Sequence, residues 1–268
     1  MIEYNARSSR SAGRLFLLRS CGIGLAPVLS AAMNPEPAFR LFGPAHLVVI
    51  GLTVGLPVFF WATARQPGRY RTAVRLTLAG MLLANWIAYE VLRAIDGQFV
   101  LVNELPMQLC DWATIAVIAA LVTCRSRLYE VAYFWGLAGT LQAIVTPNLQ
   151  EGFPSPRFIN FFVGHCGVVV GVLFLTAVEG LRPRLWSIVR AMLWSEVYLA
   201  AALLVNSLTG TNYGFLSHNP VNKSLLDYLS TNHGMYLLEL NLLAIGFYLV
   251  LYAPFWVRDL TRSSGRQR

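Results

Sequence analysis

The sequence is poor in charge and contains almost no lysine. Only 13% of its 268 residues are charged, 56% are hydrophobic, and Lys223 is the single lysine among 21 basic residues. The mean hydropathy is +0.54. A soluble domain needs a wettable surface, which this composition does not provide. The composition therefore favours burial in a lipid bilayer, and the arginine bias is typical of a GC-rich bacterial genome.

Cysteine is also scarce, and its spacing excludes the usual metal and redox motifs. The four cysteines, Cys21, Cys110, Cys124 and Cys166, form no CxxC pair. The sequence has no GxSxG elbow, no HExxH motif, no Gly-rich phosphate loop, and no histidine-to-aspartate motif of the usual lysophospholipid acyltransferases. We therefore expect no metal site, and the function considered below needs no cofactor.

Long apolar runs dominate the sequence. A helix needs roughly 20 apolar residues to cross the hydrocarbon core. Little chain remains between the runs, so we expect an all-α fold: a polytopic membrane helical bundle with seven transmembrane helices and no soluble domain. The expected spans are about 44–64, 73–94, 107–124, 128–146, 157–179, 186–208 and 233–257.

The net charge of +8 follows the expected topology, so it gives no reason to predict nucleic-acid binding. Arginine and lysine in short loops set the orientation of a membrane protein, with the basic side in the cytoplasm. One side would carry Arg65, Arg69, Arg71, Arg75, Arg125, Arg127, Arg182, Arg184, Arg190, Arg258, Arg262, Arg266 and Arg268. The other would carry only Arg40, Arg93, Arg157 and Lys223. This predicts an N-out/C-in integral protein of the bacterial cytoplasmic membrane.

Residues 1–32 contradict that orientation, because Arg7, Arg10, Arg14 and Arg19 precede the first span. The segment is interpreted either as a signal-like extension or as a misassigned start before Met33, with a poor eighth helix as a third possibility. We expect three parts: an N-terminal extension 1–32, a seven-span bundle 33–258 and a cytoplasmic tail 259–268.

Polar side chains concentrate in the outer halves of the expected spans. Ionisable groups in lipid cost several kcal/mol and are normally kept for a site or a partner. The outer halves contain His46, Asn85, Glu90, Gln108, Cys110, Gln142, His165, Asn206 and Glu239, whereas the inner halves are nearly all apolar except Glu130, Ser195 and Glu196. Interhelical hydrogen bonding alone would not favour one leaflet, so we expect a cavity open to the outside.

Several of these residues could have either of two roles. Cys110, four residues after Pro106, lies near a helix N-terminus, which favours the nucleophilic thiolate, but Asp111 opposes this and the thiol could simply pack. His165 could serve as a base or hydrogen-bond a neighbouring helix. Glu90 and Glu239 could orient an imidazole or pair with each other. His46 could be a second base or contact a lipid headgroup.

Three segments carry a resemblance to a known family: ELPMQLC, the span FINFFVGHCGVVVG with its histidine, and NYGFLSHNPVNKSLLDYL. Together they resemble the YwaF-type integral membrane proteins, which form one family with a vertebrate cysteine-dependent acyltransferase acting on ether lysophospholipids. The likeness covers about residues 40–255. It implies Cys110 as the acyl-accepting nucleophile and His165 as its partner.

The leading hypothesis is a membrane enzyme that moves acyl groups between phospholipid and lysophospholipid through a Cys110 thioester, with His165 as the base. Gln108 and Asn212 are the expected oxyanion donors. The residues expected to bind substrate are His46, Glu90, Gln108, Gln142, Asn212, Tyr213 and Glu239. The alternative is a non-enzymatic protein whose outer cavity binds or passes a small polar solute, lined by Glu90, Glu239 and His165.

Overall fold

The computed structural model describes residues 37–63, 68–95, 100, 102, 104–219 and 224–265, so the expected extension 1–32 lies outside the described residues. Within the described part the regular elements are all helices. They belong to the compact unit Phe39–Arg268. The long helices are α3 (Pro44–Ala62), α4 (Gly68–Ile95), α5 (Leu109–Thr123), α6 (Ser126–Val145), α7 (Pro156–Ala177), α8 (Leu185–Thr209) and α9 (His233–Gly265), and the short ones are η1 (Tyr213–Phe215) and η2 (Leu225–Tyr228).

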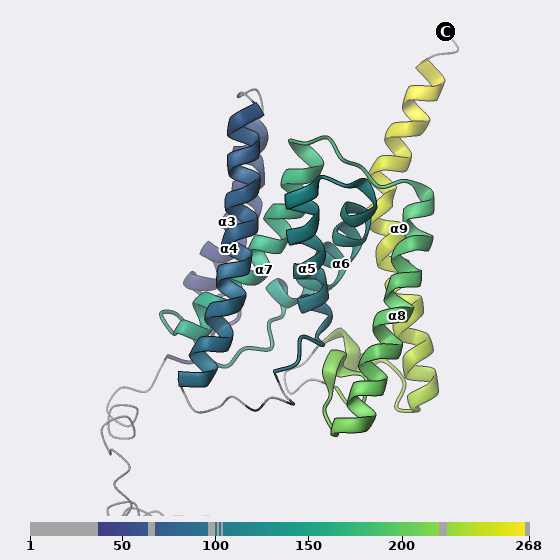
Figure 1. Cartoon of the computed structure of the whole chain (residues 1–268). Helices are drawn as coiled ribbons and strands as arrows, with labels where there is room; N and C mark the ends of the chain where they lie inside the picture. Colours follow the sequence, from purple (N-terminus) through teal and green to yellow (C-terminus); the bar gives the residue numbers. More distant parts are fainter. Residues whose placement is uncertain are drawn as a thin grey trace, which may run out of the picture. The chain divides into compact units, whose positions relative to one another are not determined.

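The long helices alternate in direction (Figure 1). α3, α5, α7 and α9 begin at the lower end of Figure 1, where α4, α6 and α8 finish. The segments 104–108, 146–155, 210–219 and 224–232 therefore lie at this lower end, and the short connections 124–125 and 178–184 lie at the upper end. The expected all-α bundle of seven long helices is confirmed for the described residues.

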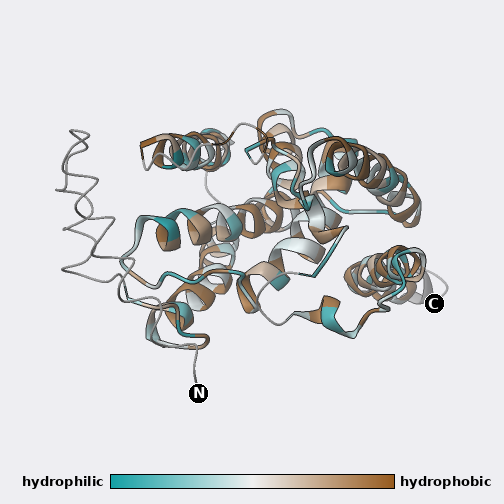
Figure 2. Ribbon diagram, turned by 90° about the horizontal axis from the view of Figure 1, so that it is seen from below, coloured by the Kyte–Doolittle hydropathy of each residue, from teal (hydrophilic) through white to brown (hydrophobic). Residues whose placement is uncertain are grey.

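Five of these helices, α3, α4, α7, α8 and α9, are long and apolar enough to cross a membrane. Their apolar side chains are exposed in large numbers, for example Trp61, Leu193 and Val250, as expected for surfaces that face lipid. Figure 2 shows hydrophobic residues, in brown, along the helices. The chain is thus an integral membrane protein. Whether it crosses seven times, and in which orientation, stays a prediction.

The remaining helices, α5 and α6, are not among these five, for different reasons. α5 has only 15 residues because Met107 and Gln108, expected inside it, precede its first turn. Gln108 is its N-cap, and the Gln108 backbone N–H donates to the Asp111 carboxylate at 2.9 Å. α6 carries Glu130 and Gln142, yet it packs against α5, α7, α8 and α9 and is largely buried. A helix enclosed by other helices needs no continuous apolar surface.

Glycines bring α5, α6 and α7 into close contact. A Cβ on Gly136 of α6 would lie 3.0 Å from Val172 on α7, and a Cβ on Gly171 would lie 3.0 Å from Val117 on α5. Small residues of this kind let helix backbones approach closely inside a membrane. The packing fixes the spacing of α5 and α7, the helices that carry Cys110 and His165.

Candidate functional site

A cavity of about 820 Å³ lies among α4, α5, α6, α7, α8 and α9 and the connections at the lower end. It reaches Leu82, Val168, Ser195 and Tyr248, near the middle of their helices. Its volume falls within the roughly 300–1,000 Å³ typical of small-molecule sites. Six of the nine polar residues expected in the outer halves thus line a ligand-sized space: Asn85, Glu90, Gln108, Cys110, Gln142 and His165.

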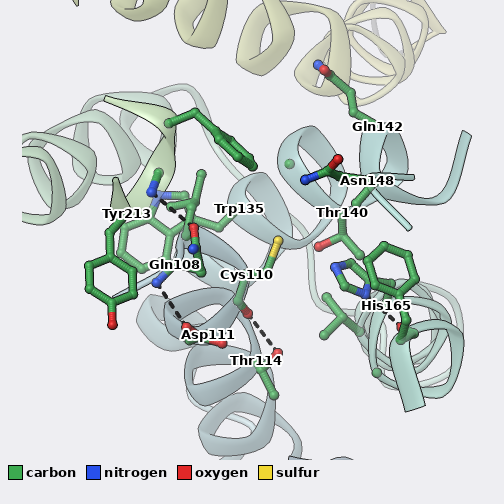
Figure 3. A pocket seen from close by; sticks show the side chains of 18 of the residues that line it. Gln108, Cys110, Asp111, Thr114, Trp135, Thr140, Gln142, Asn148, His165 and Tyr213 are labelled. Atoms are coloured by element: carbon green, nitrogen blue, oxygen red, sulfur yellow. Dashed lines mark hydrogen bonds between the residues drawn. The ribbon is translucent and has the colours of Figure 1, made fainter. Parts of the chain in front are cut away.

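Cys110 lies in the first turn of α5, and its sulfur points into this cavity (Figure 3). The thiol is free, and the Cys110 carbonyl accepts a hydrogen bond of 2.7 Å from the Thr114 hydroxyl. Cys166 is also free, and its sulfur lies 3.0 Å from the Thr53 hydroxyl oxygen on α3, within hydrogen-bond distance. No disulfide joins these thiols, so Cys110 remains available for chemistry.

His165 lines the same cavity from α7 (Figure 3). Its Nδ1 lies 2.7 Å from the Phe161 carbonyl oxygen. Because a carbonyl can only accept, Nδ1 must carry the proton, and Nε2 of the neutral ring is left with a lone pair. The Phe161 ring stacks on the imidazole with centroids 4.1 Å apart, which fixes its orientation. His165 is therefore held in the tautomer that a general base at Nε2 requires.

Four of the residues expected to bind substrate line the cavity together with Cys110 and His165: Glu90, Gln108, Gln142 and Tyr213. The Glu90 oxygen Oε2 is buried and has no hydrogen-bond partner among the described residues. Gln108 Oε1 accepts a 3.0 Å hydrogen bond from the Gly214 backbone, which leaves the Gln108 amide group available as a donor. The cavity thus contains both a carboxylate and an amide donor.

Three other expected residues, His46, Asn212 and Glu239, do not line this cavity. Phe42 N donates to His46 Nδ1 at 3.0 Å and His46 Nε2 lies 2.7 Å from the Ile144 carbonyl, so both ring nitrogens of this buried histidine are occupied. His46 therefore joins α3 to α6 and is neither a second base nor exposed to a headgroup.

The other two residues are occupied by the loops of the lower end. The Asn212 amide bonds Ser217 and His218, so it organises the loop after α8 and lies beside a small hollow lined by Gln108, Thr211 and Tyr213. Glu239 accepts a 2.6 Å hydrogen bond from the Ser230 backbone and fixes the start of α9. Neither side chain is placed to contact a ligand in the main cavity.

Two arginines that the sequence analysis used only to predict orientation, Arg93 and Arg157, form ion pairs at the lower end of the structure. Arg93 pairs with Glu104 at 2.5 Å, and Arg157 pairs with Glu151 at 2.7 Å; all four side chains line the cavity. The partners are eleven and six residues apart, respectively, across a helix boundary, so a pattern based on helical spacing could not find them. Thr140, in the C-terminal third of α6, was also missed, because a threonine there looks like an ordinary helix residue.

The Asn-Tyr-Gly motif closes the cavity over the start of α5. The Tyr213 hydroxyl donates to the Val102 carbonyl at 2.7 Å and accepts from the Leu105 N–H at 3.1 Å. Burial raises the pKa of the Tyr213 phenol, which keeps this donor protonated. Gly214 has φ +67°, and a Cβ there would lie 2.5 Å from the Tyr198 hydroxyl, so only glycine fits.

The fold and the cavity define a polytopic membrane protein in which a cysteine and a histidine face one largely apolar space. The chain belongs to the TMEM164 family, whose model matches residues 41–252. It is also similar to an uncharacterized protein of Treponema pallidum (strain Nichols), 27% identical over 239 residues that cover 85% of this chain and 94% of that protein. No solved structure matches. The resemblance seen in the sequence is thus confirmed for this family, and the YwaF-type designation stays a prediction.

Proposed function

We propose that this protein is a membrane-embedded acyltransferase that moves a fatty acyl group between phospholipids through a thioester on Cys110. The observation that carries the proposal is the placement of Cys110 and His165 on one cavity, with the Nδ1 proton of His165 held by Phe161. A thiol needs a base to become an effective nucleophile. Membership of the TMEM164 family supports the same activity.

The reaction begins when His165 Nε2 takes the proton of the Cys110 thiol. The sulfur attacks the ester carbonyl of a donor phospholipid, and the carbonyl electron pair moves onto oxygen. Collapse of this tetrahedral species breaks the bond to the glycerol oxygen, which takes the proton from the imidazolium and leaves as lysophospholipid. The acyl group is now a thioester on Cys110.

The second half reverses these roles. His165 removes the proton of an acceptor lysophospholipid hydroxyl, whose oxygen attacks the thioester. The carbon–sulfur bond breaks, the new ester leaves, and the proton returns to the Cys110 sulfur. Water in place of the lipid hydroxyl would release a free fatty acid. The Gln108 amide is a donor for the oxyanion, a contribution of about 3 kcal/mol in other acyl-transfer enzymes.

The wall formed by α9 suits a fatty acyl chain. Leu240, Leu243, Ala244 and Phe247 line the cavity at the spacing i, i+3, i+4 and i+7, so they form one stripe along the helix. This apolar stripe faces the cavity, with Asn241 and Tyr248 of the same helix beside it, and it offers a path for a hydrocarbon chain. A small polar solute would gain little from it.

A second candidate function is binding or passage of a small polar solute. The observation that favours it is the unpartnered Glu90 oxygen in the cavity, which could hold a cation or a hydrogen-bond donor. Solute binding would require Glu90 and would tolerate loss of the Cys110 thiol. Acyl transfer, in contrast, requires that thiol.

The test is lipid transfer by the purified protein in nanodiscs that contain a labelled donor phospholipid and a lysophospholipid. Cys110→Ala and His165→Ala should each reduce transfer by about 10³-fold or more, and the double variant should be no worse, because residues that act as a unit are non-additive. Mass spectrometry should find the labelled acyl group on Cys110.

The matched control is Cys166→Ala, because Cys166 is also a free cysteine but bonds Thr53 of α3. It should retain transfer. Undiminished transfer by Cys110→Ala would refute the thioester mechanism. Solute binding that survives Cys110→Ala and disappears in Glu90→Gln would establish the second candidate.

A further inference from the structure

Thr140 carries a hydroxyl for which the fold provides no partner. The residue lies in α6, is 1% exposed, and lines the cavity. Its Oγ1 makes no hydrogen bond among the described residues. A buried hydroxyl without a partner is unfavourable, and a valine of nearly the same shape would avoid the loss. A ligand in the cavity would supply the missing partner.

Several other threonines in the described helices donate their hydroxyl to a carbonyl of their own helix. Thr53 donates to the Val49 carbonyl, Thr114 to the Cys110 carbonyl and Thr176 to the Val172 carbonyl, each at 2.8 Å or less. These bonds reach the carbonyl four residues earlier, the usual partner of a helical threonine. The Thr140 hydroxyl forgoes that bond and is left available to the cavity.

The position of this hydroxyl matches the chemistry proposed for the cavity. In Figure 3 the Thr140 oxygen points toward the space between the Cys110 sulfur and the His165 ring. Ala138, Gly139 and Ala143, its neighbours on α6, also line the cavity and are small. Small side chains around a lone donor leave room for a ligand group beside it.

We propose that the Thr140 hydroxyl donates a hydrogen bond to the carbonyl oxygen of the acyl group, and so acts as an oxyanion donor in formation of the Cys110 thioester. The inference rests on the proposed acyl transfer. When sulfur bonds to the carbonyl carbon, the carbonyl electron pair moves onto oxygen, and the Thr140 donor stabilises that charge until the bond to the glycerol oxygen breaks. Thr140 then satisfies its hydrogen bond only when substrate is bound.

The experiment measures the rate at which donor phospholipid acylates Cys110, together with the thermal unfolding midpoint, in full-length protein. Thr140→Val should slow acylation by about 10²–10³-fold. It should leave the unfolding midpoint unchanged or raise it, because valine removes a buried unsatisfied group. Thr140→Ser keeps the hydroxyl and should acylate within a few-fold of wild type.

Thr176→Val is the matched control. The Thr176 hydroxyl bonds both the Val172 carbonyl and the Tyr129 hydroxyl, outside the cavity, so its loss should lower the unfolding midpoint and leave acylation unchanged. An acylation rate of Thr140→Val equal to that of wild type would overturn the proposal. It would also be overturned if Thr140→Val lowered the unfolding midpoint and Thr140→Ser failed to restore the acylation rate. Retained transfer in Cys110→Ala would instead refute the acyl-transfer function itself, so the failures are distinguishable.

Discussion

Single residues of this protein differ in how much their sequence position reveals. Cys110 and His165 could be found because thiols and imidazoles in the same half of a membrane bundle are uncommon and chemically complementary. His46 is likewise an imidazole in that half of the bundle, yet both its ring nitrogens bond backbone groups. Thr140 could not be found in this way, because its hydroxyl is distinguished only by the absence of a hydrogen-bond partner, which depends on packing. Sequence indicates which groups can react, and packing decides which ones are available.

Tyr213 shows how one hydroxyl can hold two distant loops together. Its bonds to Val102 and Leu105 connect the loop after α8 with the segment that leads into α5. Tyr213→Phe should reduce the free energy of unfolding by about 1–3 kcal/mol, because it leaves backbone groups without their partner. Acyl transfer should also fall, since Cys110 follows that segment. The measurement is thermal unfolding in detergent beside the transfer assay.

Tyr228→Phe is the control for this change. Tyr228 is 87% exposed, so removal of its hydroxyl should alter neither stability nor transfer. Equal unfolding midpoints for Tyr213→Phe and wild type would show that the two loops are held by other contacts.

Whole helices could be predicted more reliably than their ends. Each long apolar run became a helix because the requirement for apolar side chains is local and repeats along the run. The start of α5 was placed too early, because Gln108 and Asp111 form a cap that interrupts the run before Leu109. For α6, the sequence could show its polar residues but not the four helices that enclose it. That enclosure depends on contacts between distant segments.

Close packing of α5 against α7 gives a prediction at this scale. A Cβ on Gly171 would lie 3.0 Å from Val117 and 3.2 Å from Leu121, both buried on α5. Gly171→Val should therefore cost about 1–3 kcal/mol of stability by overpacking. Gly55→Val in α3 is the control, because a Cβ there meets nothing within 4 Å. Thermal unfolding of the two variants should separate them, and similar midpoints would contradict the tight contact.

In the described bundle, the cavity extends to the connections of the lower end. The arginines there that line it, Arg93 and Arg157, form ion pairs with glutamates. At the upper end the short connections carry arginines such as Arg125, Arg182 and Arg184. This distribution of arginines predicts that the upper end faces the cytoplasm. If that orientation is right, the proposed chemistry takes place in the outer leaflet.

Reporter fusions can test this orientation directly. Positive-inside bias places the upper end and the C-terminal tail 259–268 in the cytoplasm. A periplasm-dependent alkaline phosphatase should thus be inactive when fused after Arg268 and active when fused after Gly210, which follows α8 at the lower end. A cytoplasm-dependent fluorescent protein should give the reverse pattern. Both reporters are needed, because an inactive fusion alone could simply be degraded. An active phosphatase after Arg268, with a dark fluorescent fusion at that position, would invert the topology and move the Cys110 cavity to the cytoplasmic leaflet.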